Sequence, residues 1–187
     1  MGDSKSIDQS SIREARVGID DDAVCSLMSE YLTWAHERLA SDYGVIEIVA
    51  GPSEVRSSID GLRRPNGVLL LARQGDEPAG IAALRWLSPA VVELKRMYVP
   101  DRFRGRHVGS AMLDQLIDEA RHSAATLVRL DSVRFMIDAQ QLYRSRGFVE
   151  REPYEGSEIP PHLQQHWRFF ELDLGAGLAT SAQSHQM

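Results

Sequence analysis

The sequence predicts an α+β domain in which helices flank a central, mixed and mostly antiparallel twisted sheet. Three consecutive apolar segments, at 68–73, 79–87 and 91–99, are separated by short turns, a pattern typical of an antiparallel meander. The third segment leads through a charged loop into a helix at 107–122 and a further strand at 126–130, which adds a βα unit. Helices packed on such a sheet give a three-layer, α/β-type arrangement.

The other elements follow from the spacing of apolar residues and from turn residues. They are a strand at 11–17, a helix capped by one of the aspartates 20–22 and continuing to Leu39, a helix at 53–62, a helix at 138–146 ended by Gly147, and strands at 148–150 and 167–174. The segment 42–50 is compatible with more than one conformation.

Length and composition indicate a single globular domain at 11–174. The chain has 187 residues, of which 43% are hydrophobic and 26% charged, which is enough to form one core and too little for two ordinary domains. The polar residues 1–10 are expected to be disordered, and the small and polar residues 175–187 to form a flexible tail.

Charge and cysteine content narrow the class of protein. The net charge of −6 argues against a nucleic-acid partner, and no apolar run is long enough to span a membrane. Cys25 is the only cysteine, in an apolar stretch where a packed thiol is expected. The N-terminus lacks an apolar signal region, so a cytoplasmic location is expected. His162 and His166 are four residues apart, but no carboxylate completes a familiar motif, so no metal is expected.

The loop at 101–106 has the composition of an anion site. It carries Arg102, Arg104 and Arg106 around Gly105, and it joins a strand to the N-terminus of a helix. Unpaired N–H groups and the helix dipole favour negative charge at that end. The alternative is an ordinary surface loop with solvated arginines.

Two motifs resemble those of a known family. The run RGRHVGSA at 104–111, preceded by LKRMYV at 94–99, resembles the acetyl-CoA signature of the GNAT N-acetyltransferase superfamily. Arg104 and Gly109 match that signature, whereas His107 stands where its first glycine is expected. The run at 139–148 resembles the family element A-x-x-L-Y-x-x-x-G-F, with Met136 at a position where one common variant has asparagine. The resemblance spans roughly residues 13–174 and implies the GNAT fold.

The resemblance implies acetyl-CoA as cosubstrate and assigns residues to its binding. Backbone N–H groups of the loop are expected to hold the pyrophosphate, and the end of the preceding strand to pair with the pantetheine arm. The expected coenzyme-binding residues are Met97, Tyr98, Val99, Arg104, Gly105, Arg106, His107, Val108, Gly109 and Ser110.

Two side chains are candidates for the acid–base chemistry of acetyl transfer. Tyr143 matches the family tyrosine that often protonates the departing sulfur, and its alternative role is packing. Glu93 is the candidate base that takes a proton from the amine. Its alternatives are an exposed carboxylate or an ion pair with Lys95, two residues along on the same face of the strand.

Together these features predict an N-acetyltransferase that moves an acetyl group directly to a primary amine of a small molecule or peptide, in a ternary complex. The alternative is a weakly active GNAT domain that binds an acyl-CoA as a sensor or interaction module, and His107 is the feature that favours it. The identity of the amine, the length of the acyl group and the choice between monomer and homodimer stay open.

Overall fold

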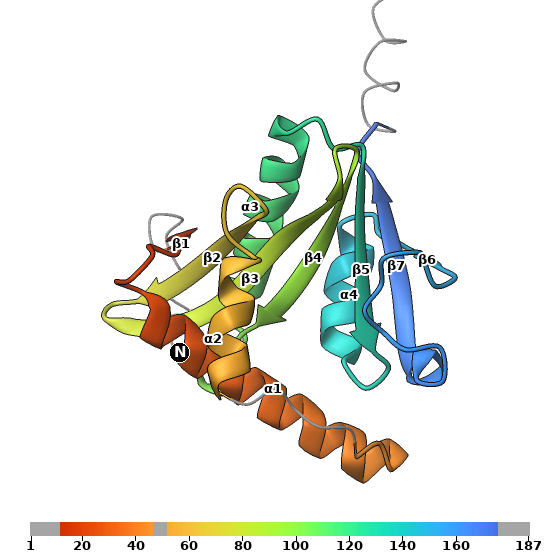
Figure 1. Ribbon diagram of the computed structural model, residues 1–187, viewed down its shortest axis with the longest axis horizontal. Coiled ribbons are helices and arrows are strands. Elements are labelled where there is room, and N and C mark those ends of the chain that lie inside the picture. Colours follow the sequence, from red (N-terminus) through yellow and green to blue (C-terminus); the bar gives the residue numbers. More distant parts are fainter. Residues whose placement is uncertain (1–11, 47–51, 176–187) are drawn as a thin grey trace, which may run out of the picture. The chain divides into compact units, whose positions relative to one another are not determined.

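The computed structural model describes residues 12–46 and 52–175. Its elements in chain order are β1 (Ile12–Glu14), α1 (Asp21–Tyr43), α2 (Pro52–Asp60), β2 (Gly67–Gln74), β3 (Glu77–Ser88), β4 (Val91–Tyr98), the 3₁₀ turn η2 (Asp101–Phe103), α3 (Val108–His122), β5 (Leu127–Val133), α4 (Ile137–Ser145), β6 (Val149–Arg151), the 3₁₀ turn η3 (Gln164–His166) and β7 (Trp167–Asp173) (Figure 1).

The strands form a seven-stranded sheet in the order β1-β2-β3-β4-β5-β7-β6. The β4–β5 pair is parallel, whereas β1–β2, β2–β3, β5–β7 and β6–β7 are antiparallel. The predicted α+β class with a mixed, mostly antiparallel sheet is confirmed. Among the described residues, no helix combines the length and apolar character needed to cross a bilayer.

The chain forms two compact units. The first contains the described residues up to Arg85 together with Lys95–Leu116, and the second contains Trp86–Leu94 together with the described residues from Ile117 onward. The predicted disordered segment 1–10 lies outside the described residues, as does the predicted tail apart from Gly175.

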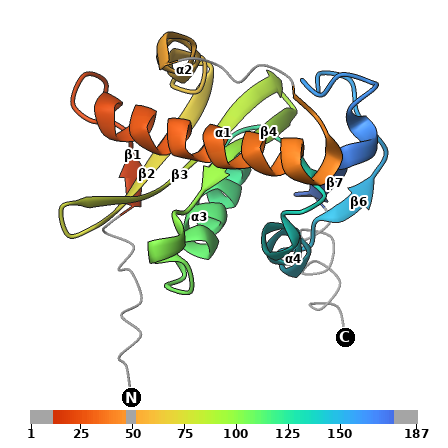
Figure 2. The ribbon, with the colours of Figure 1, turned by 90° about the horizontal axis from the view of Figure 1, so that it is seen from below.

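In the first unit, helices cover both faces of β2 and β3 (Figures 1 and 2). Helices α1 and α2 lie on one face, where alternate strand residues such as Leu71 and Ile81 join their apolar side chains in one buried cluster. The first half of α3 lies on the opposite face. Gly80 permits this close approach, because an added Cβ there would lie 2.8 Å from Cε of Met112 and 3.1 Å from the carbonyl oxygen of Tyr98.

The start of α1 differs from the expectation that an aspartate side chain caps it. Asp20 occupies the N-cap position, but its carboxylate makes no capping hydrogen bond. It accepts two hydrogen bonds from the Arg13 guanidinium, at 2.7 and 3.0 Å, and one from the Arg16 backbone N–H at 2.8 Å. These bonds tie the turn after β1 back onto that strand, so β1 ends at Glu14 rather than at residue 17.

The C-terminal end of α1 resolves part of the ambiguous segment 42–50. The helix runs to Tyr43 and ends at Gly44, which has a φ of 68°. Residues without a Cβ adopt this left-handed conformation at little cost, which explains the stop. Residues 47–50 lie outside the described residues.

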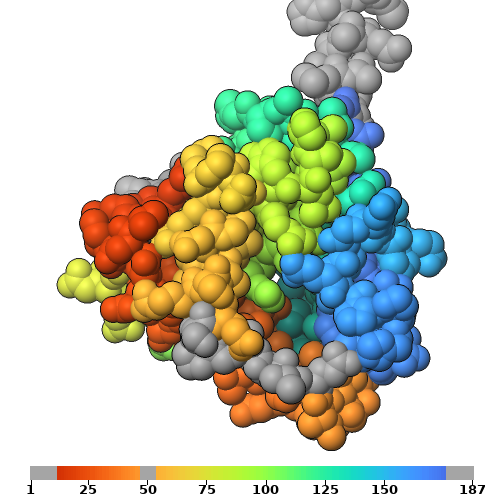
Figure 3. All heavy atoms as spheres, viewed as in Figure 1, coloured from red at the N-terminus to blue at the C-terminus, as the bar shows by residue number. Residues whose placement is uncertain are grey.

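In the second unit, the two faces of β7 have different covers. Phe170 packs against Tyr143 of α4, with ring centroids 6.2 Å apart. Its neighbour Phe169 points to the other face, where Tyr154 meets it edge-on at 5.8 Å. Tyr154 belongs to the segment that connects β6 to η3, which lies at the surface of this unit (Figure 3). As predicted, α4 is followed by Gly147, whose φ is 88°.

Candidate functional site

The loop before α3 ends in two left-handed residues. Gly105 has a φ of 74° and His107 a φ of 62°. The His107 carbonyl oxygen accepts the Ala111 N–H at 3.0 Å and the Ser110 hydroxyl at 2.8 Å, which starts the helix. The N–H groups of its first turn therefore have no acceptor within the helix, and they form the end that attracts an anion.

The backbone at His107 bears on the missing family glycine. Glycine is the residue that adopts positive φ without strain, and histidine is among the few others that tolerate it. Since His107 has that conformation, the path of the backbone into α3 is the one that a glycine would allow. The exposed side chain is the remaining difference from the family pattern.

Arg104 is held by several groups of the first unit. Its guanidinium lies 2.7 Å from the Asp101 carboxylate, and its Nε donates to the carbonyl oxygen of Val99 at 3.2 Å. It also lies 5.5 Å from the centre of the Trp34 ring. This signature arginine therefore bridges the loop, the end of β4 and α1.

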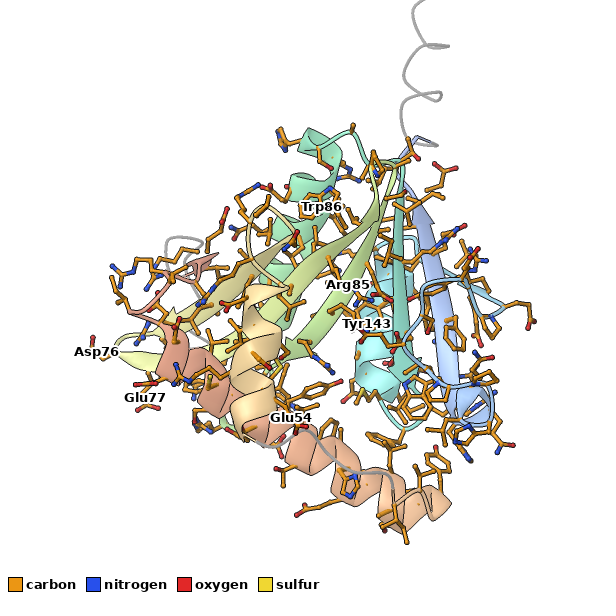
Figure 4. All side chains as sticks on the ribbon, viewed as in Figure 1. Glu54, Asp76, Glu77, Arg85, Trp86 and Tyr143 are labelled. Atoms are coloured by element: carbon orange, nitrogen blue, oxygen red, sulfur yellow. The ribbon has the colours of Figure 1, made fainter. Side chains whose placement is uncertain are left out.

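Arg102 and Arg106 lie on the same aromatic ring. Their guanidinium carbons are 4.9 and 5.7 Å from the centre of the Phe103 ring, and Arg106 also donates to the Gln74 side chain. Beside them is an open hollow of about 310 Å³, lined by these three residues with Gln74 and Glu77. The turn that carries Glu77 is labelled in Figure 4. The hollow thus presents two cations beside an aromatic face.

The second half of β4 is irregular where the coenzyme arm is expected. Arg96 has a φ of 55°, which interrupts the regular strand just before Met97. The side chain of Tyr98 is buried, and its hydroxyl donates to Glu30 at 3.0 Å. Burial, followed by the hydrogen bond and the charge of Glu30, raises the pKa of Tyr98 to about 12. Tyr98 therefore uses its side chain to hold α1, and its backbone is the part left for a ligand.

Glu93 belongs to the second unit and is fully buried. Its Oε1 accepts a hydrogen bond from the Tyr154 hydroxyl at 2.7 Å. The parallel register places Glu93 beside Arg129 of β5, and the next register places Arg129 beside Glu171 of β7. The alternative of an exposed carboxylate is therefore wrong.

Two arginines lie beside Tyr154. The guanidinium carbons of Arg129 and Arg151 are 5.4 and 5.7 Å from the centre of its ring. Both arginines pair with Glu171, Arg129 through its Nε at 2.7 Å. Burial raises the pKa of the Tyr154 hydroxyl far above its usual range, and the charges of Asp131 and Glu93 add to this. The hydroxyl therefore keeps its proton and serves as a donor.

Tyr143 is packed within the second unit (Figure 4). It is 6% exposed, and its ring contacts Phe148 at 5.9 Å as well as Phe170. A neighbouring contact fixes α4, because buried Gln140 donates to the carbonyl oxygen of Val133 at the end of β5, over 2.8 Å. The packing role is thus observed, and the acid role stays a prediction.

The sequence offered no signal for two of these side chains. Tyr154 lies 61 residues from Glu93 along the chain, and no local spacing links them. Gln140 occupies a variable position of its motif. By contrast, Cys25 packs against the core beside α1 as predicted, and burial raises the pKa of its thiol. In the part of the chain that the structure describes, no three His, Cys, Asp or Glu residues are grouped as metal ligands.

Comparison with known proteins identifies the family. The model of the acetyltransferase (GNAT) family matches residues 23–148, which is more than half of the chain. The chain belongs to the GNAT family. This GNAT protein is 31% identical over 98 residues to an uncharacterized N-acetyltransferase of Schizosaccharomyces pombe, covering 51% of the chain and 60% of the relative. It is 28% identical over 127 residues to the uncharacterized N-acetyltransferase YedL of Escherichia coli, covering 66% and 77%.

The alignment with an uncharacterized N-acetyltransferase of Dictyostelium discoideum covers 30% of that protein. The chain thus spans less than two thirds of the length of these first two relatives. Solved structures show the same fold. A GNAT acetyltransferase of Staphylococcus aureus Mu50 superposes with a TM-score of 0.67 at 19% identity, covering 87% of this chain and 98% of that one. A Bacillus subtilis acetyltransferase in complex with CoA gives 0.59 at 20% identity, covering 87% and 97%.

Proposed function

We propose that this GNAT protein is an acetyl-CoA-dependent N-acetyltransferase that acts on a primary amine of a small molecule or peptide. The observation that carries the proposal is the loop at 104–110, where left-handed Gly105 and His107 lead into the open N-terminus of α3 among three exposed arginines. Backbone N–H groups and cations are the donors that a pyrophosphate needs. The relatives named N-acetyltransferases and the CoA-bound neighbour support the same assignment.

The coenzyme residues have distinct roles in this proposal. The N–H groups of Val108, Gly109 and Ser110 face the pyrophosphate, and Arg104, Arg106 and the backbone from Gly105 to His107 surround it. The backbone of Met97, Tyr98 and Val99 follows the pantetheine arm, and one of its N–H groups polarises the thioester carbonyl. Positive φ at Arg96 supports this, because a strand interrupted there leaves its backbone groups free to face a ligand.

Transfer takes place with both substrates held together. The amine nitrogen forms a bond to the acetyl carbon while the C–S bond breaks, and no covalent enzyme intermediate is required. Glu93 accepts the proton that the amine loses, through water since its carboxylate is fully buried. Tyr143 donates a proton to the departing sulfur. Neither role needs a metal ligand.

The sensor alternative rested on His107 standing in place of a glycine. The left-handed backbone at this residue favours the enzyme instead, because the shape of the loop does not depend on a glycine there. A cytoplasmic location and a monomeric or dimeric state belong to the proposal as expectations.

The test is turnover by the full chain. Acetyl-CoA is incubated with a panel of alkylamines, amino acids and short peptides, and thiol release is followed together with the mass of the acetylated product. Amine-dependent thiol release with matching product supports the enzyme. Binding of acetyl-CoA by calorimetry with no transfer to any amine would favour the sensor, and propionyl-CoA in parallel reports the preferred acyl length.

A further inference from the structure

The buried hydrogen bond between Tyr154 and Glu93 joins two parts of the second unit that have no link in sequence. Glu93 is on β4, where the parallel pairing with β5 begins, and Tyr154 is in the segment after β6. Their oxygens are 2.7 Å apart, and the exposed fractions are 0% for Glu93 and 6% for Tyr154. A carboxylate hidden from water needs such a donor, because an unsatisfied buried charge is costly.

The ring of Tyr154 is itself held in place from several sides. Phe169 meets it edge-on at 5.8 Å, and Arg129 and Arg151 lie 5.4 and 5.7 Å from its centre. Both arginines are fixed through Glu171. The hydroxyl is therefore directed by a rigid set of contacts from β5, β6 and β7, and it does not depend on the mobility of a single loop residue.

The segment that carries Tyr154 is anchored at both ends. After Tyr154, the Ser157 N–H donates to the Tyr154 carbonyl oxygen at 3.2 Å, forming a turn. Near its far end, Nε of Arg134 donates to the carbonyl oxygen of Gln165 at 2.7 Å. The raised pKa of the Tyr154 hydroxyl also keeps it protonated at every pH at which an amine would be acetylated.

We propose that Tyr154 is a positioning residue for the base, holding the Glu93 carboxylate in one orientation through its hydroxyl. This rests on the proposed function, in which Glu93 takes the proton of the amine. Oε1 is occupied by the Tyr154 hydrogen bond, so Oε2 is the oxygen left to accept that proton. The segment 152–166 is thereby connected to the acid–base chemistry and does more than cover the sheet.

The experiment is a double-mutant cycle with Tyr154→Phe, Glu93→Gln and the double variant, using the amine that the wild type acetylates best. Tyr154→Phe removes one hydroxyl and keeps the ring among Phe169 and the two arginines. We expect its kcat to fall by on the order of tenfold to a hundredfold, since slight misplacement of a reacting group costs that much. The KM for acetyl-CoA and the melting temperature should stay close to those of the wild type.

The cycle separates positioning from general structural support. In the Glu93→Gln background, where no base remains to be positioned, Tyr154→Phe should cause no further loss of kcat. An equal loss in both backgrounds would overturn the proposal, because Tyr154 would then act independently of Glu93. An unchanged kcat in the single Tyr154→Phe variant would overturn it as well.

Failure of the proposed function is visible in the wild-type arm alone. If the wild type transfers acetyl to no amine, the enzyme assignment and the role of Tyr154 both fall. If the wild type and Tyr154→Phe turn over equally well, the enzyme assignment stands and the role of Tyr154 falls. As a packing control, Phe169→Leu removes the edge contact without removing the hydroxyl, and it should lower the melting temperature far more than it lowers kcat.

Discussion

Tyr143 of α4 and Phe170 of β7 pack with their ring centroids 6.2 Å apart, and this contact places the candidate acid in the core of the second unit. A tyrosine in such a position can serve packing through its ring and chemistry through its hydroxyl. The two contributions are separable because a single oxygen atom distinguishes tyrosine from phenylalanine.

The substitution Tyr143→Phe should lower kcat on the order of 10²-fold or more if the hydroxyl protonates the departing sulfur. The ring contacts persist, so the affinity for acetyl-CoA and the melting temperature should change little. The measurement is steady-state and single-turnover kinetics with the preferred amine. Full retention of both rates would make Tyr143 a packing residue. Phe148→Leu, which disturbs the same ring contacts, shows how much altered packing alone slows the reaction.

Glu93→Gln should remove the base while keeping its shape. The amide oxygen can still accept the Tyr154 hydroxyl, so the buried contact is retained and folding is preserved. The rate should fall most at low pH, where the neutral amine is scarcest, and the acidic limb of the pH profile should flatten. Arg129 and Tyr154 keep the same charge across that range, and their presence does not mimic the effect. A pH profile that does not move would assign the deprotonation to water or to another group.

Gly109→Glu should abolish coenzyme binding. It places a bulky anion in the first turn of α3, where the helix end would otherwise attract phosphate. Calorimetry with acetyl-CoA measures the loss. The matched control is Gln115→Glu, which adds the same charge at an exposed position farther along α3 and should bind normally. Unchanged affinity in Gly109→Glu would remove the loop from the coenzyme site.

Local sequence signals predicted the elements but not all of their limits. The alternation of β5 continues beyond the predicted end at Leu130, because polar Asp131 and Ser132 pair with Phe169 and Arg168 of β7. A polar pair in sequence resembles a strand end, and only the partner strand shows otherwise. In the same way, the bonds from Arg13 to Asp20 shorten β1 by long side-chain reach rather than by local propensity.

The candidate site divides along the same line. The loop at 104–110 is contiguous, so its glycine, arginines and helix start could be predicted together. The surroundings of Glu93 could not, because Tyr154 and Arg129 reach it from other elements of the second unit. Spacing predicts what lies on one element, and pairing between distant strands decides what meets across them.

His107→Gly should stabilise the protein by roughly 0.5–1 kcal/mol, because relief of left-handed strain exceeds the added freedom of glycine in the unfolded chain. At this chain length the melting temperature should rise by about 2 °C. His107→Ala, which keeps a Cβ at a φ of 62°, should give no such gain. Since the backbone is the same in both states, any change in acetyl-CoA affinity of the glycine variant reports on the imidazole. The exposure of His107 leads us to expect none.

Asp20→Asn tests the ion-pair cluster before α1, by thermal unfolding across pH. Asp20 is 1% exposed, and its carboxylate lies 2.7 Å from Arg13, 3.3 Å from Arg16 and 3.5 Å from Arg73. The hydrogen bonds from Arg13 and then those from Arg16 hold the pKa of Asp20 far below its usual range. Loss of this charge should cost about 2 kcal/mol at neutral pH.

The sign of the pH dependence follows from the lowered pKa. An unfolded aspartate ionises near pH 4, so above about pH 5 the folded and unfolded chains both carry the charge and the stabilisation is complete. Below that, the unfolded chain gains a proton that the folded chain refuses, and the difference in stability between the wild type and Asp20→Asn should shrink as the pH falls. The control is Asp42→Asn, which breaks a more exposed pair with Arg38 at 2.7 Å and should change the melting temperature little. A stability difference for Asp20→Asn that is constant from pH 7 to pH 3 would show that the loss comes from packing and not from the charge.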